Sequence, residues 1–325
     1  MHLTILSRGM GVHTTRRLVE AANTLGYQSR VVDPVELQMG LGTVGPRVFW
    51  KDKPYGRTDV IIPRIAPSIN AYGLALVNQF DISGVAVLND AMAIAHSRNK
   101  MRLMQLLSRQ GIPVPKTVIG RGALELKRMI ALVGGYPVAI KLVRAQEKLG
   151  IIICETPQSL EAAVEAVLSM GHDIIVQRYV KPGDGRDLRA LVVGGQVVAA
   201  VRRQPLAGRL QHSLSVGARV TRARLTPTQR HIAIESARVV GLEVAAIDLL
   251  ALKSGETQVF EVNSSPGLRE MEEATGDDLA TLVIEHAAQL ARNRRRLVAL
   301  ARAERTKRNA GRLAANTRSM RPTQQ

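Results

Sequence analysis

The stretch "VFEVNSSPGL", residues 259–268, ends an apolar run with two polar residues and then a Pro-Gly turn. Alternate side chains of a strand share a face, so Phe260 and Val262 are predicted to point toward a core. Glu261 and Asn263 then point to the opposite side. The Glu261 carboxylate then needs an interaction partner, because an unpaired charge in a buried strand costs several kcal/mol.

A second apolar run, "VAAIDLLAL" at residues 244–252, carries a single carboxylate, Asp248. We expect this run to be the strand beside the first. Asp248, Glu261 and Asn263 would then present two carboxylates and an amide oxygen, which are the hard ligands that Mg²⁺ or Mn²⁺ prefers. The alternative is that both strands have one solvated face and that these are ordinary polar residues.

Two lysines raise a matching question. Lys141 interrupts the apolar run "YPVAIKLV", where a buried ammonium would favour an anion such as a nucleotide phosphate. Lys100 opens a predicted helix and is a second candidate for a phosphate contact. The alternatives are an edge-strand lysine for Lys141 and a solvated helix lysine for Lys100.

Composition narrows the class of protein. The chain has 325 residues, of which 46% are hydrophobic and only 3% aromatic, so it is globular and has few rings for stacking on single-stranded nucleic acid. One cysteine, Cys154, excludes a disulfide framework and is expected to be a buried core residue within "IIICE". The seven histidines show no zinc-ligand spacing.

The N-terminal sequence "MHLTILSRGM" lacks the basic and long apolar segments of a signal peptide. No uninterrupted apolar run reaches the roughly 18 residues that span a membrane. We therefore expect a cytoplasmic protein with no membrane partner.

Alternating strand and helix patterns predict a doubly wound parallel sheet at the N-terminus, followed by α+β units. We expect an α/β domain at 1–95, a linker helix at 96–111, a central domain at 112–180, a C-terminal domain at 181–290 and a basic tail at 291–325. The tail is expected to be helical or disordered.

Local signals support the C-terminal assignment. Gly194-Gly195 separates two apolar runs, which predicts a two-residue β-hairpin. Thr226, Pro227 and Gln229 form the N-cap, first turn and capping box of a predicted helix.

These pieces, in this order, resemble the ATP-grasp ligases, and more closely their RimK type. The resemblance covers about residues 1–290. It rests on the segments "ILSRG", "IIPRI", "MQLLSRQGIPVP", "AIKLV", "DLRALVVGGQVVAA", "AAIDLLAL" and "EVNSSPGL". RimK-type enzymes add glutamate to the C-terminus of a small-subunit ribosomal protein, and they are often tetramers.

The resemblance implies an ATP-grasp fold and an ADP-forming ligation that passes through an acyl phosphate. ATP would lie between a central lid and the C-terminal sheet. Asp248, Glu261 and Asn263 would hold two Mg²⁺ or Mn²⁺ ions, and Lys100 and Lys141 would contact phosphates. The hinge beside the adenine would be Gln177, Arg178, Tyr179 and Val180, and Asp187 would contact the nucleotide or shape its pocket.

Three segments depart from the family pattern. The glycine-rich lid loop is replaced by "RAQEKLG", residues 144–150, which keeps only the last glycine, and Lys148 would supply positive charge instead of the backbone N–H groups of a glycine loop. Arg178 stands where the family usually has Glu. The loop "LQHSLSVGA", residues 210–218, replaces a basic loop near the transferred phosphoryl group, and Val216 stands where an arginine is expected.

Within that loop Gln211, His212 and Ser213 remain the candidates for contacts with the nucleotide. Arg209 or Arg219 would take the catalytic role of the missing arginine if the loop is rearranged. Two hypotheses follow: a working RimK-like ligase with altered substrate specificity, or a degenerate ATP-grasp protein that acts through nucleotide binding or a basic surface.

The charge distribution suggests an acidic partner. The net charge is +18, and residues 292–325 contain 11 Lys/Arg against one acid. Between Leu188 and Ile234 there are eight arginines and no acid. Glutamate, an acidic protein C-terminus, a ribosomal protein or ribosomal RNA would each fit this charge. A solvated helix end is the alternative for the tail.

Overall fold

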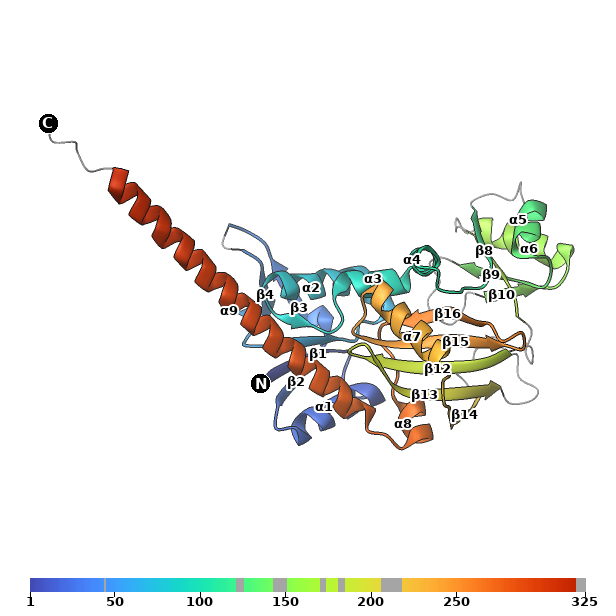
Figure 1. Ribbon diagram of the computed structural model, residues 1–325, viewed down its shortest axis with the longest axis horizontal. Helices are drawn as coiled ribbons and strands as arrows, with labels where there is room; N and C mark the ends of the chain where they lie inside the picture. The colour runs from blue at the N-terminus through green and yellow to red at the C-terminus, as the bar shows by residue number, and fades with distance from the viewer. Residues whose placement is uncertain are drawn as a thin grey trace.

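In the computed structural model the chain is described over residues 1–43, 45–120, 126–142, 151–169, 174–180, 185–205 and 218–319, and it forms four β-sheets there (Figure 1). The N-terminal sheet is parallel, with strand order β2-β1-β6-β7. Its strands are β1 (His2–Leu6), β2 (Gln28–Val32), β6 (Val60–Pro63) and β7 (Ala86–Val87). Its helices are α1 (His13–Thr24) and α2 (Asn70–Ile82). The predicted parallel sheet is thereby confirmed.

Both faces of the N-terminal sheet are buried, as is usual for parallel strands. Leu3 and Ile5 of β1 pack into one cluster, while Leu6 and Ile61 pack into another on the opposite face. A small antiparallel sheet that the sequence patterns did not reveal follows β2. It consists of β3 (Leu37–Gly40), β4 (Arg47–Trp50) and β5 (Lys53–Pro54), and short 3₁₀ turns occur at Pro34–Glu36 and Pro67–Ile69.

Two helices, rather than one, link this domain to the rest: α3 (Ala91–Arg98) and α4 (Lys100–Arg109). Asn99 separates them, because its side chain accepts a hydrogen bond from the backbone N–H of Arg102 at 3.0 Å and so caps α4. The cap makes Lys100 the first residue of α4.

The central unit contains an antiparallel sheet of order β10-β9-β11-β8, named here the lid sheet. Its elements are β8 (Thr117–Gly120), α5 (Leu126–Val133), β9 (Val138–Leu142), β10 (Ile151–Cys154), α6 (Pro157–Ser169) and β11 (Ile174–Arg178). Its helices and one sheet face share a hydrophobic cluster. Cys154 is fully buried there, as predicted.

The C-terminal sheet is antiparallel, with order β14-β13-β12-β15-β16. Its elements are β12 (Gly185–Val193), β13 (Gln196–Pro205), β14 (Ala218–Arg222), α7 (Pro227–Val240), β15 (Val244–Leu252) and β16 (Thr257–Asn263). The hairpin between β12 and β13 is confirmed, since Gly194 and Gly195 have φ values of 56° and 75°. The capping box of Thr226 and Gln229 is also confirmed.

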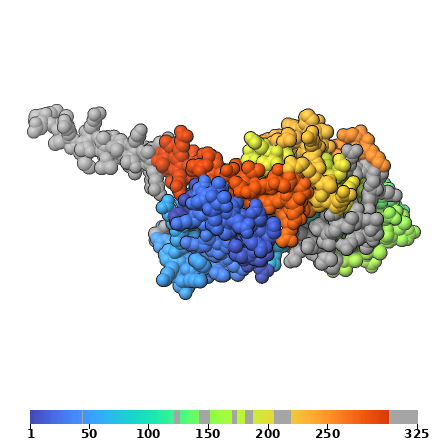
Figure 2. Space-filling view, turned by 90° about the horizontal axis from the view of Figure 1, so that it is seen from below, coloured from blue at the N-terminus to red at the C-terminus, as the bar shows by residue number. Residues whose placement is uncertain are grey.

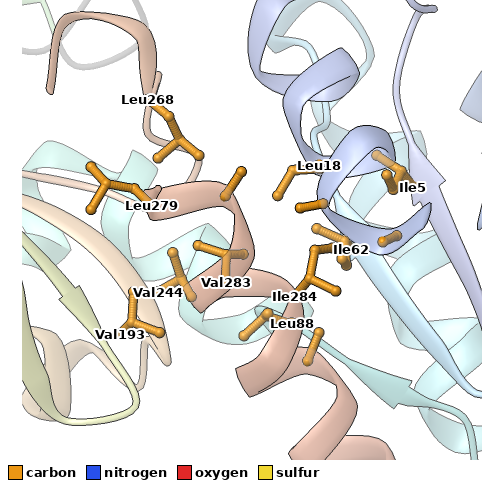
Figure 3. Packing of buried hydrophobic residues seen from close by; sticks show 14 of the residues in the cluster. Ile5, Leu18, Ile62, Leu88, Val193, Val244, Leu268, Leu279, Val283 and Ile284 are labelled. Carbon is orange, nitrogen blue, oxygen red and sulfur yellow. The ribbon is translucent and has the colours of Figure 1, made fainter. Parts of the chain in front are cut away.

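Two further helices, α8 (Arg269–Thr275) and α9 (Leu279–Ser319), complete the chain. The buried start of α9 lies between the N-terminal domain and the C-terminal sheet, as Figure 2 shows for its orange-red segment. Val283 and Ile284 of α9 meet Ile62 from one side and Val193 from the other (Figure 3). One cluster therefore fixes the two domains against each other.

The second half of α9 extends away from the body of the molecule (Figure 1). Leu297 and Leu300 are exposed there. Ion pairs of Arg294 with Asp81 and of Arg295 with Asp59 anchor the point where the helix leaves. Within the described part of the chain, no helix is both long and apolar enough to cross a membrane.

Candidate active site

The two strands expected to share a polar site are neighbours. β15 pairs with β16 in antiparallel register, and Asp248 lies directly opposite Glu261. Asn263, two residues further along β16, lies opposite Ala246 on the same face. The predicted juxtaposition of these three side chains is therefore present.

A β-bulge corrects the prediction for Phe260. Asp248 pairs with Glu261, but Leu249 pairs with Val259, so Phe260 is the extra residue of β16. Val259 and Val262 are the residues buried in the core, while Phe260 is only half-buried. The sequence alternation placed Phe260 in the core because it assumed an uninterrupted strand.

Asp248 is buried and bound by two arginines. Arg189 donates from Nε to Oδ1 at 2.6 Å and from Nη2 to Oδ2 at 2.7 Å. Arg203 Nη2 lies 3.1 Å from Oδ2. Burial alone would raise the pKa of the Asp248 carboxyl, but the charges and hydrogen bonds of the two arginines hold it below its ordinary value. Asp248 is therefore ionised, and the solvated-face alternative is wrong for this residue.

Asp187, the candidate for shaping the nucleotide pocket, joins the same network. Its Oδ1 accepts from Arg203 Nη2 at 2.9 Å, while its buried Oδ2 has no partner. Burial raises the pKa of Asp187 to about 6, with the nearby charge of Asp248 adding to the effect and Arg203 opposing it. Asp187 thus keeps one oxygen for a further donor.

Glu261 differs from Asp248 in its surroundings. Its side chain remains accessible to solvent. Its pKa is nevertheless raised, first because the surrounding protein restricts its hydration and second because of the charge of Asp248. These observations are compatible because protein surrounds the carboxylate on several sides while one side stays open. Glu261 is therefore the solvent-accessible carboxylate of the Asp248–Glu261 pair.

The two candidate lysines come from separate elements and lie near each other, and Lys141 also lies near this carboxylate. Lys141 of β9 interacts electrostatically with both Lys100 of α4 and Glu261 of β16. Burial, and to a smaller extent the charge of Lys100, lower the pKa of Lys141 to about 8, while the charge of Glu261 opposes the shift. β9 lies between β10 and β11, so the edge-strand alternative for Lys141 is wrong.

The donor set fits a divalent cation that also binds phosphates. An ionised carboxylate has about four lone-pair sites. Three contacts from arginines occupy Asp248, which leaves roughly one site for a metal. Asn263 Oδ1 accepts from the backbone N–H of Ser265 at 2.8 Å and has a second lone pair.

In the described residues, no three His, Cys, Asp or Glu side chains gather into a metal site by themselves. A cation here would therefore depend on Asn263 and on ligand phosphates to complete its shell. This is the usual arrangement for Mg²⁺, which takes one or two carboxylates plus substrate oxygens.

The predicted adenine-side hinge lies at the end of β11 in the lid sheet. Gln177 is buried on the sheet face that carries Lys141, and its Nε2 donates to Thr117 Oγ1 at 2.9 Å. The exposed Arg178 side chain points to the opposite face of the sheet. Tyr179 and Val180 follow and are half-buried.

The catalytic candidates stay predictions. Arg209 and the nucleotide candidates Gln211, His212 and Ser213 lie outside the described residues, as do the altered lid loop at 144–150 and Val216. Arg219 is exposed on β14 opposite Gln204, whereas its neighbour Val220 lies opposite Arg203. Arg219 therefore faces the side of the sheet away from Asp248.

Sequence reasoning missed the roles of Arg189, Arg203 and Glu270. The first two were counted only as positive charge, yet they hold Asp248, and Glu270 accepts from Arg189 Nη1 at 3.0 Å. The Gly194-Gly195 turn sets the pairing of β12 with β13 only as far as Val192, because the register shifts between Leu191 and Val192, so this signal was not sufficient to find Arg203.

Comparisons with known proteins agree with this architecture. A family model described as RimK-like ATP-grasp domain matches residues 97–287, and another described as RimK PreATP-grasp domain matches residues 1–94. A curated protein of Pseudomonas paraeruginosa, called probable alpha-L-glutamate ligase, is 39% identical over 286 residues, which cover 88% of this chain and 95% of that protein.

Solved structures show the same fold. The ATP-grasp ligase PsnB, complexed with its minimal precursor, superposes with a TM-score of 0.72 at 20% identity, covering 89% of this chain and 98% of that one. The D-alanine-D-alanine ligase from Coxiella burnetii gives a TM-score of 0.69 at 16% identity, covering 95% and 99%. The expected ATP-grasp fold is confirmed, and the basic extension after residue 287 lies outside both family models.

Proposed function

This chain belongs to the RimK-like ATP-grasp family, and from that membership we propose that it is an ATP-dependent, ADP-forming carboxylate–amine ligase. Its amine substrate would be glutamate or a related amino acid, and its acceptor a carboxylate of a protein or peptide. The observation that supports this best is the series of electrostatic interactions from Lys100 to Lys141, from Lys141 to Glu261 and from Glu261 to Asp248, which lie on four different elements. In such an arrangement the lysines are suited to bind the phosphates of a nucleotide, and the carboxylates are suited to bind the metal ion that accompanies them.

In this proposal Asp248, Glu261 and Asn263 hold two Mg²⁺ or Mn²⁺ ions, which supply charge neutralisation for the phosphates when bound. Lys141 and Lys100 neutralise phosphate oxygens from the opposite side. The bidentate grip of Arg189 fixes the Asp248 carboxylate, so it needs no reorientation when ligands arrive.

The reaction proceeds in two displacements. An oxygen of the acceptor carboxylate bonds to the γ-phosphorus as the bond to ADP breaks, giving an acyl phosphate. The amine nitrogen then bonds to the acyl carbon, phosphate leaves with the bonding electrons, and the nitrogen loses a proton. The protein's contribution is to position reactants and stabilise charge.

A degenerate ATP-grasp protein that binds nucleotide without turnover is the competing proposal, motivated by the altered segments at 144–150 and 210–218. ADP release should be measured with ATP, Mg²⁺ and each amino acid, with and without ribosomal proteins or acidic peptides. Substrate-dependent ADP release that Glu261→Gln abolishes supports the ligase. Metal-dependent ATP binding without any such release supports the competing proposal.

We also propose that the extension of α9 contacts a polyanion such as ribosomal RNA. The helix leaves the body of the molecule with exposed Leu297 and Leu300, and the segment 292–325 carries a net charge of +10, from 11 basic residues and one acid (Figure 1). Phosphate contacts of this kind weaken steeply with salt. Binding of RNA to the full chain that does not respond to salt would contradict this proposal.

A further inference from the structure

A small pocket lies where the N-terminal domain meets the loop that follows β16. It sits at the carboxyl end of β6 and beside α1, the helix that follows β1, where the strand order β2-β1-β6-β7 changes direction. Open α/β sheets bind ligands at such a switch point. The pocket is lined by Thr14, Leu18, Ile62, Arg64, Leu88, Asn89, Val244, Ser264, Pro266, Leu268 and Val283.

Arg64 is the only cationic side chain among these lining residues. Its Nη1 donates to the carbonyl of Pro266 at 3.1 Å and its Nη2 to that of Ser265 at 3.5 Å. Its Nε is buried without a partner, and no carboxylate of the described residues forms an ion pair with it. Burial lowers the pKa of Arg64 to about 10, with no acid to offset the effect.

Arg17 provides the contrast at the same domain junction. It reaches Glu20 at 2.8 Å, Glu272 at 3.2 Å and Asp278 at 3.0 Å, so its charge is matched within the protein. Arg64 has only backbone carbonyls, which carry no net charge. Because a partly buried cation without a counter-charge is unfavourable, this position suits an external anion.

The start of α1 adds positive potential to the same pocket. Thr14, in its first turn, is a lining residue. The N-cap Val12 provides no side-chain hydrogen bond and the first turn has no acid, so the partial positive charge of the helix start is not neutralised locally. Buried His13 Nδ1 and Ser265 Oγ, next to lining residues, also have no hydrogen-bond partner.

The size of the pocket limits the ligand. Its cavity volume of about 20 Å³ exceeds the 10–15 Å³ or so needed for one water and is far below what a nucleotide requires. Leu18, Ile62 and Leu88 give it apolar walls. A single planar anionic group such as a carboxylate matches this size.

We propose that Arg64 binds a carboxylate of the substrate, with the α-carboxylate of free glutamate as the first candidate. The substrate identity rests on the proposed ligase function. The lining residues Ser264 and Pro266 lie one and three residues after Asn263 in the chain, so a substrate held here lies beside the strand that carries Glu261. Arg64 is thus a specificity-determining residue that selects carboxylate over amide.

The test compares carboxylate probes with their amides. Binding to the full chain loaded with ADP and Mg²⁺ should be measured by calorimetry for glutamate and for its α-amide. A second pair, a peptide ending in a free or an amidated glutamate, distinguishes the amino acid from the acceptor as the source of the carboxylate. The wild type should prefer one free carboxylate by about 10- to 100-fold, as expected for one or two charge-assisted hydrogen bonds.

Arg64→Gln should lose this preference and Arg64→Lys should keep part of it. Arg17→Gln, which removes an arginine from the same junction, should keep it fully, and urea unfolding of each variant reports whether it is folded. An Arg64→Gln protein that still prefers the carboxylate, or a wild type that prefers neither carboxylate, overturns the inference. A wild type that shows the preference but releases no ADP overturns the ligase proposal instead.

Discussion

Replacing Asp248 with Asn separates the structural role of this carboxylate from its proposed role in metal binding. The substitution keeps the shape of the side chain, but it removes the charge that two buried arginines share. It also turns one acceptor into an NH₂ group that faces arginine donors. Breaking a buried ion pair by removing one partner typically costs about 3–5 kcal/mol.

The lower end of this range is expected for Asp248→Asn. Arg189 keeps Glu270 at 3.0 Å and Arg203 keeps Asp187 at 2.9 Å, so neither guanidinium is left without an anion. We therefore expect the free energy of unfolding to fall by about 3 kcal/mol, measured by urea denaturation at neutral pH.

Glu261→Gln is the matched control. Glu261 is accessible to solvent and forms no ion pair with any other described residue, so its replacement should change the unfolding free energy by no more than about 0.5 kcal/mol. Both variants should weaken Mg²⁺-dependent ATP binding by at least about tenfold, since replacing even a residue that only hydrogen-bonds to a metal ligand typically lowers metal affinity by that factor.

Calorimetric titration with ATP, in the presence of Mg²⁺ and then of a chelator, provides the functional readout. The reasoning is refuted if the two variants are equally stable, because Asp248 would then not hold the arginines. It is refuted equally if Glu261→Gln binds ATP with Mg²⁺ as tightly as the wild type.

Three further outcomes are expected. Since burial and Lys100 hold the pKa of Lys141 at about 8, ATP affinity measured calorimetrically should fall up to about tenfold per pH unit above that value, and Lys141→Met should abolish the pH dependence. Burial raises the pKa of Asp187 from 3.8 to about 6, so the folded protein holds this proton more tightly than the unfolded chain. The stability that results is fully present below pH 3.8 and is lost as the pH rises through about 6. Urea unfolding at several pH values should show this fall of roughly 3 kcal/mol in the wild type and not in Asp187→Asn; an identical pH profile would contradict the assignment. Deleting residues 301–325 should weaken RNA binding in filter assays and leave the free energy of unfolding unchanged. Deleting residues 292–325 should also lower the free energy of unfolding by up to about 1 kcal/mol for each anchoring ion pair of α9. Undiminished RNA binding after the shorter deletion would count against the proposed contact.

The bulges explain which parts of the site the sequence could not predict. A regular two-residue hairpin at Gly194-Gly195 would place Asp187 opposite Arg202. Val192 pairs with Val197 but Leu191 pairs with Ala199, so one residue of β13 is skipped and Asp187 lies opposite Arg203. That shift brings Arg203 to the face of the sheet that carries Asp248.

Local patterns were sufficient for much of the fold. Strand alternation and the polar interruptions at Asp248 and Glu261 predicted the β15–β16 pair, and the cap at Thr226 predicted the start of α7. These features depend on residues close together in the chain or on a simple two-residue period. The prediction that Lys100 opens a helix is confirmed, because Asn99 caps α4, and the linker segment also contains the end of α3.

The sequence by itself determined the residue types of the polar site, the family pattern that contains them and the basic character of the C-terminal segment. Only the tertiary structure decided which charges compensate one another. It placed two arginines on Asp248 and left Arg64 with backbone carbonyls alone. The physical reason is that ion pairing depends on distances of a few ångströms between residues far apart in the chain, and a one-residue bulge changes those distances without changing the sequence pattern.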